Sequence, residues 1–166
     1  MSQLKDNDKA DYNIDGVGNF VNNIKNGLLK EKKVKKSEYI FAVIANLIIL
    51  YIANNLLNWN LSFITASFSQ VLWVINLTIG ITILGNLLFL IYNPPWFRHL
   101  MKVVMNFFAF IATYIFYIVF PLSFSQFYVV FAFKFALIIA MIVLILSIAF
   151  EIVKLFFRIF YRSGTL

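Results

Sequence analysis

The chain has 166 residues, of which 62% are hydrophobic and 13% are charged, and its formal net charge is +7. Soluble domains are about half apolar and about one quarter charged, so this composition excludes an ordinary water-soluble fold and indicates an integral membrane protein. The chain contains no cysteine, which excludes disulfides, thiolate metal sites and thiol nucleophiles.

The positive charge raises the question of nucleic-acid binding, because basic patches neutralise phosphates. Here the lysines and arginines instead lie beside hydrophobic segments, which is the pattern of a membrane surface. We therefore expect the lipid bilayer as a partner, with anionic lipids at the cytoplasmic face, and no nucleic acid.

The N-terminal arm divides into two parts. Residues 1–15 are polar and acidic, which predicts a disordered segment. In residues 16–37, apolar side chains recur at helical spacing beside a basic cluster, which favours a short amphipathic cytoplasmic helix lying on the membrane surface. A purely topogenic signal and a partner-docking segment are the alternatives. The expected lipid-headgroup contacts in this cluster are Lys32, Lys33, Lys35 and Lys36.

The hydrophobic part of the chain predicts four membrane spans, because about 20 apolar residues cross the hydrocarbon layer. Asparagines from Asn54 to Asn60 break the first long apolar stretch, two prolines at 94 and 95 end the second span, and Pro121 ends the third. The expected transmembrane domain is 38–158, with a tail at 159–166. Its spans are about 39–57, 68–92, 100–120 and 127–157. We expect an all-α, polytopic protein whose four transmembrane helices form one bundle.

The distribution of basic residues predicts the orientation. The side holding both termini and the 93–101 loop carries the lysines and arginines that flank the spans, and the two opposite loops carry none. By the positive-inside rule, both termini are expected in the cytoplasm, which places the protein in the cell membrane as a multi-pass protein.

Polar residues within the spans are candidate functional positions, because lipid leaves them unsolvated. Asn46 and Asn106 each lie in a small-residue stripe, so an interhelical hydrogen bond and a substrate or ion contact are the two interpretations. The second span carries Trp73, Asn76 and Gly80 on one side. Its other side carries Thr78, Thr82 and Gly85, with Asn86 nearby, which predicts packing on both sides.

The fourth span separates two kinds of residue. Ala132, Ala136, Ala140 and Ser147 form a small-residue stripe with Glu151 near its cytoplasmic end, whereas Lys134 points about 150° away by helical geometry. If the alanine stripe faces the bundle, Lys134 faces lipid or another subunit. Snorkelling of its ammonium toward the interface is one interpretation, and a functional cation is the other.

Charged and aromatic residues near the cytoplasmic ends are expected to anchor the protein or to contact lipid headgroups. Trp96, Arg98 and Arg158 belong to this set, and Glu151 and Lys154 lie at the same level. The lone His99 is expected to be a loop residue rather than a base or a ligand.

The sequence contains no phosphate loop, dinucleotide fingerprint, zinc motif or nucleophile elbow. We therefore expect no catalytic residues, no metal site and no cofactor. The function favoured is a small non-enzymatic membrane protein that acts through helix association, as a homo-oligomer or as an accessory subunit of a membrane complex. The alternative is an oligomeric channel or transporter for ions or small solutes.

Short motifs add a resemblance. The segments Trp59 to Gln70, Trp73, Asn76 and 93–97 (Asn-Pro-Pro-Trp-Phe) together resemble small, uncharacterised four-span membrane proteins of archaea and bacteria. The resemblance covers most of the membrane part, implies the four-span fold and implies no activity.

Overall fold

The computed structural model describes residues 19, 23 and 35–163, with side chains as far as Ile159. In residues 35–163 it contains four helices: α2 (Lys36–Asn55), α3 (Phe68–Ile91), α4 (Pro95–Val119) and α5 (Phe127–Ser163). Each is long and apolar enough to cross a membrane, which confirms the all-α fold and indicates a multi-pass membrane protein. The expected 1–15 segment, almost all of the 16–37 helix and the end of the tail lie outside the described residues.

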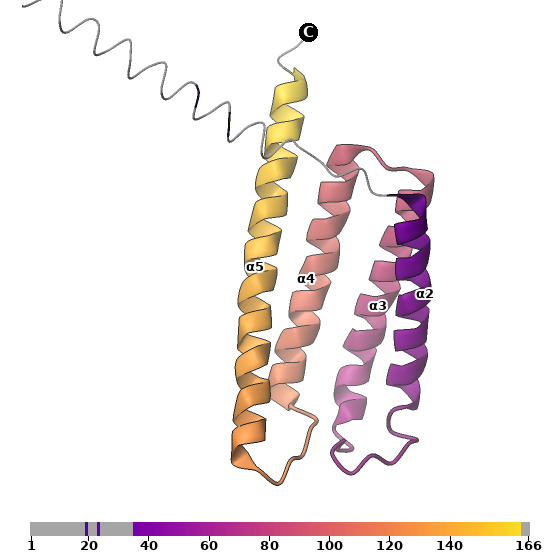
Figure 1. The fold of residues 1–166 in the computed structure, drawn as a ribbon, viewed down its shortest axis with the longest axis vertical. Coiled ribbons are helices and arrows are strands. Elements are labelled where there is room, and N and C mark those ends of the chain that lie inside the picture. The colour runs from indigo at the N-terminus through magenta and orange to yellow at the C-terminus, as the bar shows by residue number, and fades with distance from the viewer. Residues whose placement is uncertain (1–18, 20–22, 24–34, 164–166) are drawn as a thin grey trace, which may run out of the picture. The chain divides into compact units, whose positions relative to one another are not determined.

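The helices form an open bundle and alternate in direction (Figure 1). In the part of the chain that the structure describes, α2 contacts α3, α3 contacts α4 and α4 contacts α5, whereas α2 and α5 do not touch. α3 lies between α2 and α4, so this span does pack on two sides; of the residues predicted for the first side, however, Trp73 is exposed and a Cβ on Gly80 would meet nothing within 4 Å. Each of the four described helices therefore keeps a face that contacts none of the others.

The helix ends follow from local chemistry. The side chains of Asn54 and Asn55 donate to backbone carbonyls one turn back, at 2.8 Å each, and the following turn uses a left-handed Asn60 with φ of 48°. Asparagine tolerates that conformation better than other non-glycine residues. At the end of α4, Phe120 is also left-handed (φ 38°), and its N–H donates to Phe116 O at 2.8 Å.

α4 begins earlier than the sequence suggested, at Pro95 instead of about residue 100. Pro95 occupies the first helical position, where the missing N–H costs nothing and the fixed φ suits the helix. The same prolines that end α3 therefore start α4. As a result, Arg98 and His99 are helical, and the expectation that His99 lies in a loop is wrong.

The best-packed apolar side chains join α2, α3 and α4. Phe89 is 3% exposed, and its ring lies 5.3 Å from the ring of Tyr39 on α2 and 6.1 Å from that of Phe97 on α4. Farther along α3, Val71 and Val74 are completely buried. These contacts hold the first three helices in fixed positions relative to one another.

Two connections, residues 56–67 between α2 and α3 and residues 120–126 between α4 and α5, lie at the same end of the four helices. We call this end the loop end, and the two connections are hydrogen-bonded to each other. Ile64 and Leu122 form an antiparallel bridge. The Thr65 N–H donates to Pro121 O at 3.1 Å, and the Ser123 N–H donates to Phe63 O at 2.9 Å. The bridge ties the first helical hairpin to the second.

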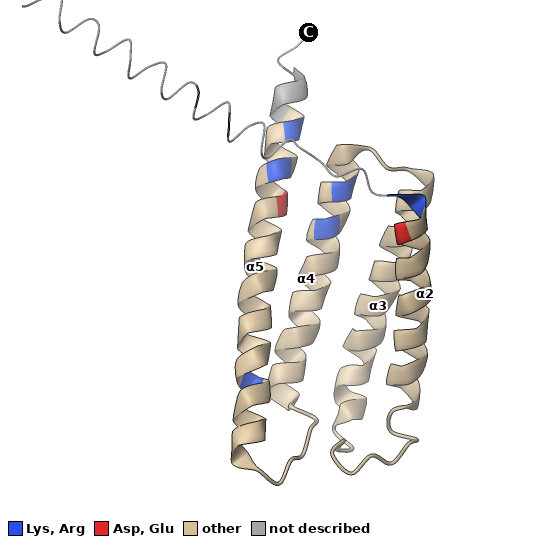
Figure 2. Cartoon of the chain, in the orientation of Figure 1, with Lys and Arg blue, Asp and Glu red and all other residues tan. Residues whose placement is uncertain are grey.

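Charged residues gather at the opposite end, called the basic end (Figure 2). Its lysines and arginines with described side chains are Lys35, Lys36, Arg98, Lys102, Lys154 and Arg158. One further basic residue, Lys134, lies on α5 seven residues from its start at the loop end.

Candidate functional site

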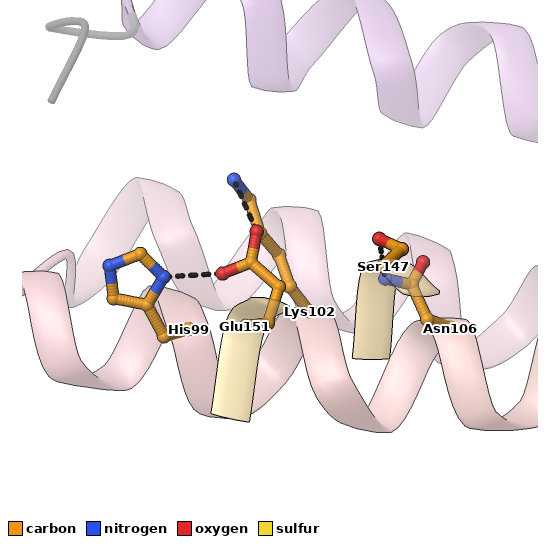
Figure 3. A network of polar contacts seen from close by, with 5 residues as sticks. All are labelled: His99, Lys102, Asn106, Ser147 and Glu151. Carbon is orange, nitrogen blue, oxygen red and sulfur yellow. Dashed lines mark hydrogen bonds and ion pairs between the residues drawn. The ribbon is translucent and has the colours of Figure 1, made fainter. Parts of the chain in front are cut away.

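A line of polar side chains runs along the contact between α4 and α5 near the basic end (Figure 3). His99 Nδ1 and Glu151 Oε2 form a hydrogen bond across the two helices, and Lys102 Nζ lies 3.7 Å from Glu151 Oε1. We call the group of residues that makes these contacts the polar seam. It consists of His99, Lys102 and Asn106 of α4 and of Ser147 and Glu151 of α5.

Helix geometry explains why these residues meet. His99, Lys102 and Asn106 are spaced by three and four residues, so they share one face of α4, and Ser147 and Glu151 share one face of α5. Because α4 and α5 are antiparallel, the two rows run past each other in register. The Asn106 amide accordingly donates to Ser147 Oγ at 2.8 Å, two turns from His99.

The pair of His99 and Glu151 in the polar seam is unusual because both side chains are buried. His99 is 4% exposed and Glu151 is 9% exposed, although both are ionisable and both lie in helices long enough to span a membrane. An isolated buried carboxylate is strongly disfavoured in an apolar medium, whereas a hydrogen-bonded partner and a nearby cation offset that cost. The arrangement can hold a proton between His99 and Glu151 and can cross-link α4 to α5.

Three other predicted positions have different neighbours. Asn76 exchanges two hydrogen bonds with Asn54 of α2, each 2.9 Å long, and so joins α2 to α3. Asn46 and Asn86 each donate to a backbone carbonyl one turn back on their own helix, at 2.7 and 2.8 Å. Of the predicted intramembrane set, the structure brings only Asn106 and Glu151 into the same site.

Lys134 lies against the end of α4. Its Nζ is 5.1 Å from the ring centroid of Phe120 and 5.9 Å from that of Tyr117. The ammonium therefore lies on two aromatic rings and near the carbonyl end of α4, and both favour a cation. Meanwhile Ala132 and Ala136 are exposed, so the half of the alanine stripe near the loop end does not face the bundle.

α5 packs instead through a heptad-like row that includes Lys134, Leu137, Met141 and Leu144, all half-buried. The sequence left open which face of this helix meets the bundle; near the loop end it is the row that contains Lys134 and not the alanine stripe. Ser147 does face α4, as its hydrogen bond to Asn106 shows.

The predicted headgroup residues fall into four groups. Arg98 and Arg158 are half-buried at the basic end of α4 and α5, and Lys35 and Lys36 are exposed at the start of α2. Trp96 packs edge to face on Tyr92 and Phe97. Lys32 and Lys33 lie outside the described residues.

Sequence reasoning missed His99 as a site residue, and it also missed Asn54 as the partner of Asn76. The spacing of His99, Lys102 and Asn106 could have revealed the polar seam, had α4 been started at Pro95. Within the residues that the structure describes, no group of three metal-ligating side chains occurs. A cavity of about 300 Å³ lies apart from these residues, in the first connection at the loop end, beside Leu57, Asn60 and Ile64.

Comparison with protein-family models, with curated proteins and with solved structures gave no match for this chain.

Proposed function

We propose that this chain is a small non-enzymatic membrane protein that acts by binding another transmembrane helix on the exposed face of α3, in a homo-oligomer or as a subunit of a membrane complex. The observation that carries the proposal is Gly80. A Cβ built on this residue would meet nothing within 4 Å. Glycine costs a helix up to about 1 kcal/mol relative to alanine, so its use at an open position needs a reason outside the chain.

Gly85 is the internal comparison. A Cβ there would lie 2.8 Å from Met105 Sδ of α4, so close packing within the chain accounts for that glycine. No such neighbour accounts for Gly80.

The surroundings of Gly80 also suit a helix. Trp73, Leu77 and Leu84 lie on the same face at spacings of four, three and four residues, and they are 58%, 43% and 60% exposed. Large side chains around a small one form the kind of notch into which a neighbouring helix packs in membranes. Lipid tails, in contrast, require no small residue.

Replacing Gly80 with leucine tests the proposal. The Gly80→Leu variant is expected to stay folded but to lose its partner, so that its particle mass in nanodiscs falls to that of one chain when the partner is a second copy. Gly80→Ala is expected to weaken association less. An unchanged oligomer in Gly80→Leu would reject this face, and a monomeric wild-type chain would leave only a different protein as the partner, identifiable by cross-linking in native membranes.

Cross-linking supplies the matched control, because the chain has no cysteine of its own. A Leu77→Cys variant is expected to form a disulfide dimer in oxidising conditions if two copies meet at α3. Phe41→Cys, on the exposed face of α2, is expected not to do so. Dimers of equal yield from both positions would indicate random collision and would count against the proposed face.

We further propose that the basic end faces the cytoplasm, so that both termini are cytoplasmic and the basic residues meet anionic lipids. The distribution of lysine and arginine supports this orientation. A membrane-impermeant maleimide added to intact cells is expected to label Ser125→Cys at the loop end and not Ser2→Cys. The reverse labelling pattern would invert the proposed topology.

The alternative of an oligomeric channel makes a different prediction. Many polar side chains within the spans already pair inside the chain, as in Asn54 with Asn76 and Asn106 with Ser147, which favours association over a water-filled path. Ion flux through proteoliposomes that disappears in Gly80→Leu would favour the channel instead.

A further inference from the structure

Lys134 lies within a membrane span and far from the acidic side chains that the structure describes. It follows Phe127, the first residue of α5, by seven positions, which is about 10 Å along the helix. The sequence has no aspartate or glutamate between Glu38 and Glu151. Glu38 lies in the first turn of α2, and Glu151 is bonded to His99 near the start of α4, so both acids belong to the basic end. Neither acid can pair with an ammonium near the loop end.

The ammonium of Lys134 reaches back toward the loop end. Its Nζ lies 5.1 Å from the ring centroid of Phe120, the residue directly after α4, and 5.9 Å from that of Tyr117, about one turn earlier. Aromatic faces attract a cation, but they offer no oxygen to the three N–H donors of an ammonium. Among the described residues, Lys134 makes no ion pair and no hydrogen bond. Two rings therefore hold the charge in place while its donors stay available to a ligand.

The neighbouring residues indicate that this ammonium lies near a membrane surface. Tyr128, in the first turn of α5, is 69% exposed, and tyrosine is typical of the layer where a span meets the headgroups. Ser123 and Ser125, in the connection 120–126, are exposed as well. Lipid phosphates lie in this layer, and a lysine whose stem runs along apolar surface can bring its ammonium to them.

A phosphate is the ligand that suits this arrangement. An ammonium is a compact charge with three donors, and its hydrogen bonds to an anionic oxygen are stronger than those between neutral groups. We propose that Lys134, fixed against Phe120 and Tyr117, binds the phosphate of a phospholipid headgroup in the leaflet at the loop end. The position of Nζ at the level where α4 ends favours a headgroup over an acidic side chain inside a neighbouring span. The inference does not depend on the proposed association through α3.

The test titrates the purified full-length chain, held in maltoside micelles, with dihexanoyl phosphatidylglycerol and, separately, with inorganic phosphate. Tryptophan fluorescence follows thermal unfolding, and binding to the folded state raises the unfolding temperature, from which an affinity is obtained. Lys134→Met is expected to bind the lipid about tenfold more weakly, whereas Lys134→Arg, which keeps the charge, is expected to stay within about threefold of the wild type. Stabilisation by the lipid alone would support a headgroup, and equal stabilisation by inorganic phosphate would overturn the assignment to a lipid.

The matched control is Lys154→Met, the same substitution on the same helix at the basic end, which is expected to keep the wild-type affinity. The lipid-induced shift is compared between variants, because removal of the charge also changes stability without lipid. Equal affinity in the wild type and in Lys134→Met would overturn the proposal, as would failure of the lipid to stabilise the wild-type chain. If the methionine variant does not fold, Lys134→Gln takes its place with the same expected loss. A wild-type chain that ignores the lipid but loses an associated protein in Lys134→Met would assign the lysine to an acidic partner helix instead.

Discussion

At the scale of single residues, His99 and Glu151 are two ionisable side chains that are buried together and bonded to each other. Each is buried in a predominantly apolar helix, and the bond between the two side chains is a hydrogen bond. Removing one partner of a buried pair leaves the other without solvation, which is more damaging than removing both. The pair therefore behaves as a unit.

A double-mutant cycle is expected to show this coupling. His99→Leu and Glu151→Leu singly should each lower the free energy of unfolding by about 3 kcal/mol, because the buried group that remains loses its hydrogen-bonding partner on the facing helix. The double variant should lose less than the sum of the two. Reversible unfolding in mixed micelles measures all three values, and strict additivity would mean that the pair contributes no mutual stabilisation.

Lys134 is a second residue whose charge carries a free-energy cost that its contacts partly offset. A lysine within a membrane span costs up to about 3 kcal/mol, whereas its two aromatic contacts return about 0.5–2 kcal/mol. Lys134→Met keeps the length of the side chain and removes the charge, so the free energy of unfolding is expected to rise by about 1 kcal/mol. The same unfolding assay applies, with Lys134→Arg as a charge-retaining control. A loss of stability in the methionine variant would show that the aromatic contacts outweigh the cost of placing the charge in the span.

At the scale of helices, the four membrane spans and the residues that end them could be located from the sequence. Features that depend on contact with a neighbouring helix could not. Pro94 and Pro95 stop α3 by their chemistry, but the same chemistry permits a helix start, and only packing decides between the two. α5 has one small-residue face and one large-residue face, and no property of α5 alone says which face meets α4. The pairing of Asn54 with Asn76 likewise needs two helices at a known register.

The close approach of α3 and α4 gives a prediction at this scale. Gly85→Leu would push a side chain into Met105, and the resulting overpacking is expected to lower the free energy of unfolding by about 1–3 kcal/mol. A second substitution, Met105→Ala, should restore part of the loss by making room. If the pair gave no recovery, the cost would lie in the helix itself and not in its contact.

At the scale of the whole unit, the bridge at the loop end holds the two helical hairpins together. Ile64 and Leu122 are opposed in an antiparallel bridge, and facing residues in such pairs lie within the Cα separation that a disulfide needs. Because the chain has no cysteine, an Ile64→Cys/Leu122→Cys variant would contain only these two thiols.

That variant is expected to form an intramolecular disulfide on mild oxidation. After cleavage at a protease site inserted in the 93–94 connection, the two halves should migrate together on a denaturing gel and should separate after reduction. Ile64→Cys alone is the control and should give halves that separate in both conditions. Separation of the oxidised double variant would show that the loops do not meet.

The order of contacts along the chain also bears on assembly. Because α2 touches α3, α3 touches α4 and α4 touches α5, each helix finds its neighbour as soon as both have been synthesised. The bridge between Ile64 and Leu122 instead joins two connections that are not consecutive. It can form only after α4 and Leu122 have been synthesised. Contacts that are close in sequence form quickly and leave little apolar surface exposed during biogenesis. A nascent chain of this kind can therefore be inserted one helix at a time, and the contact between Ile64 and Leu122 forms after α4 has been inserted.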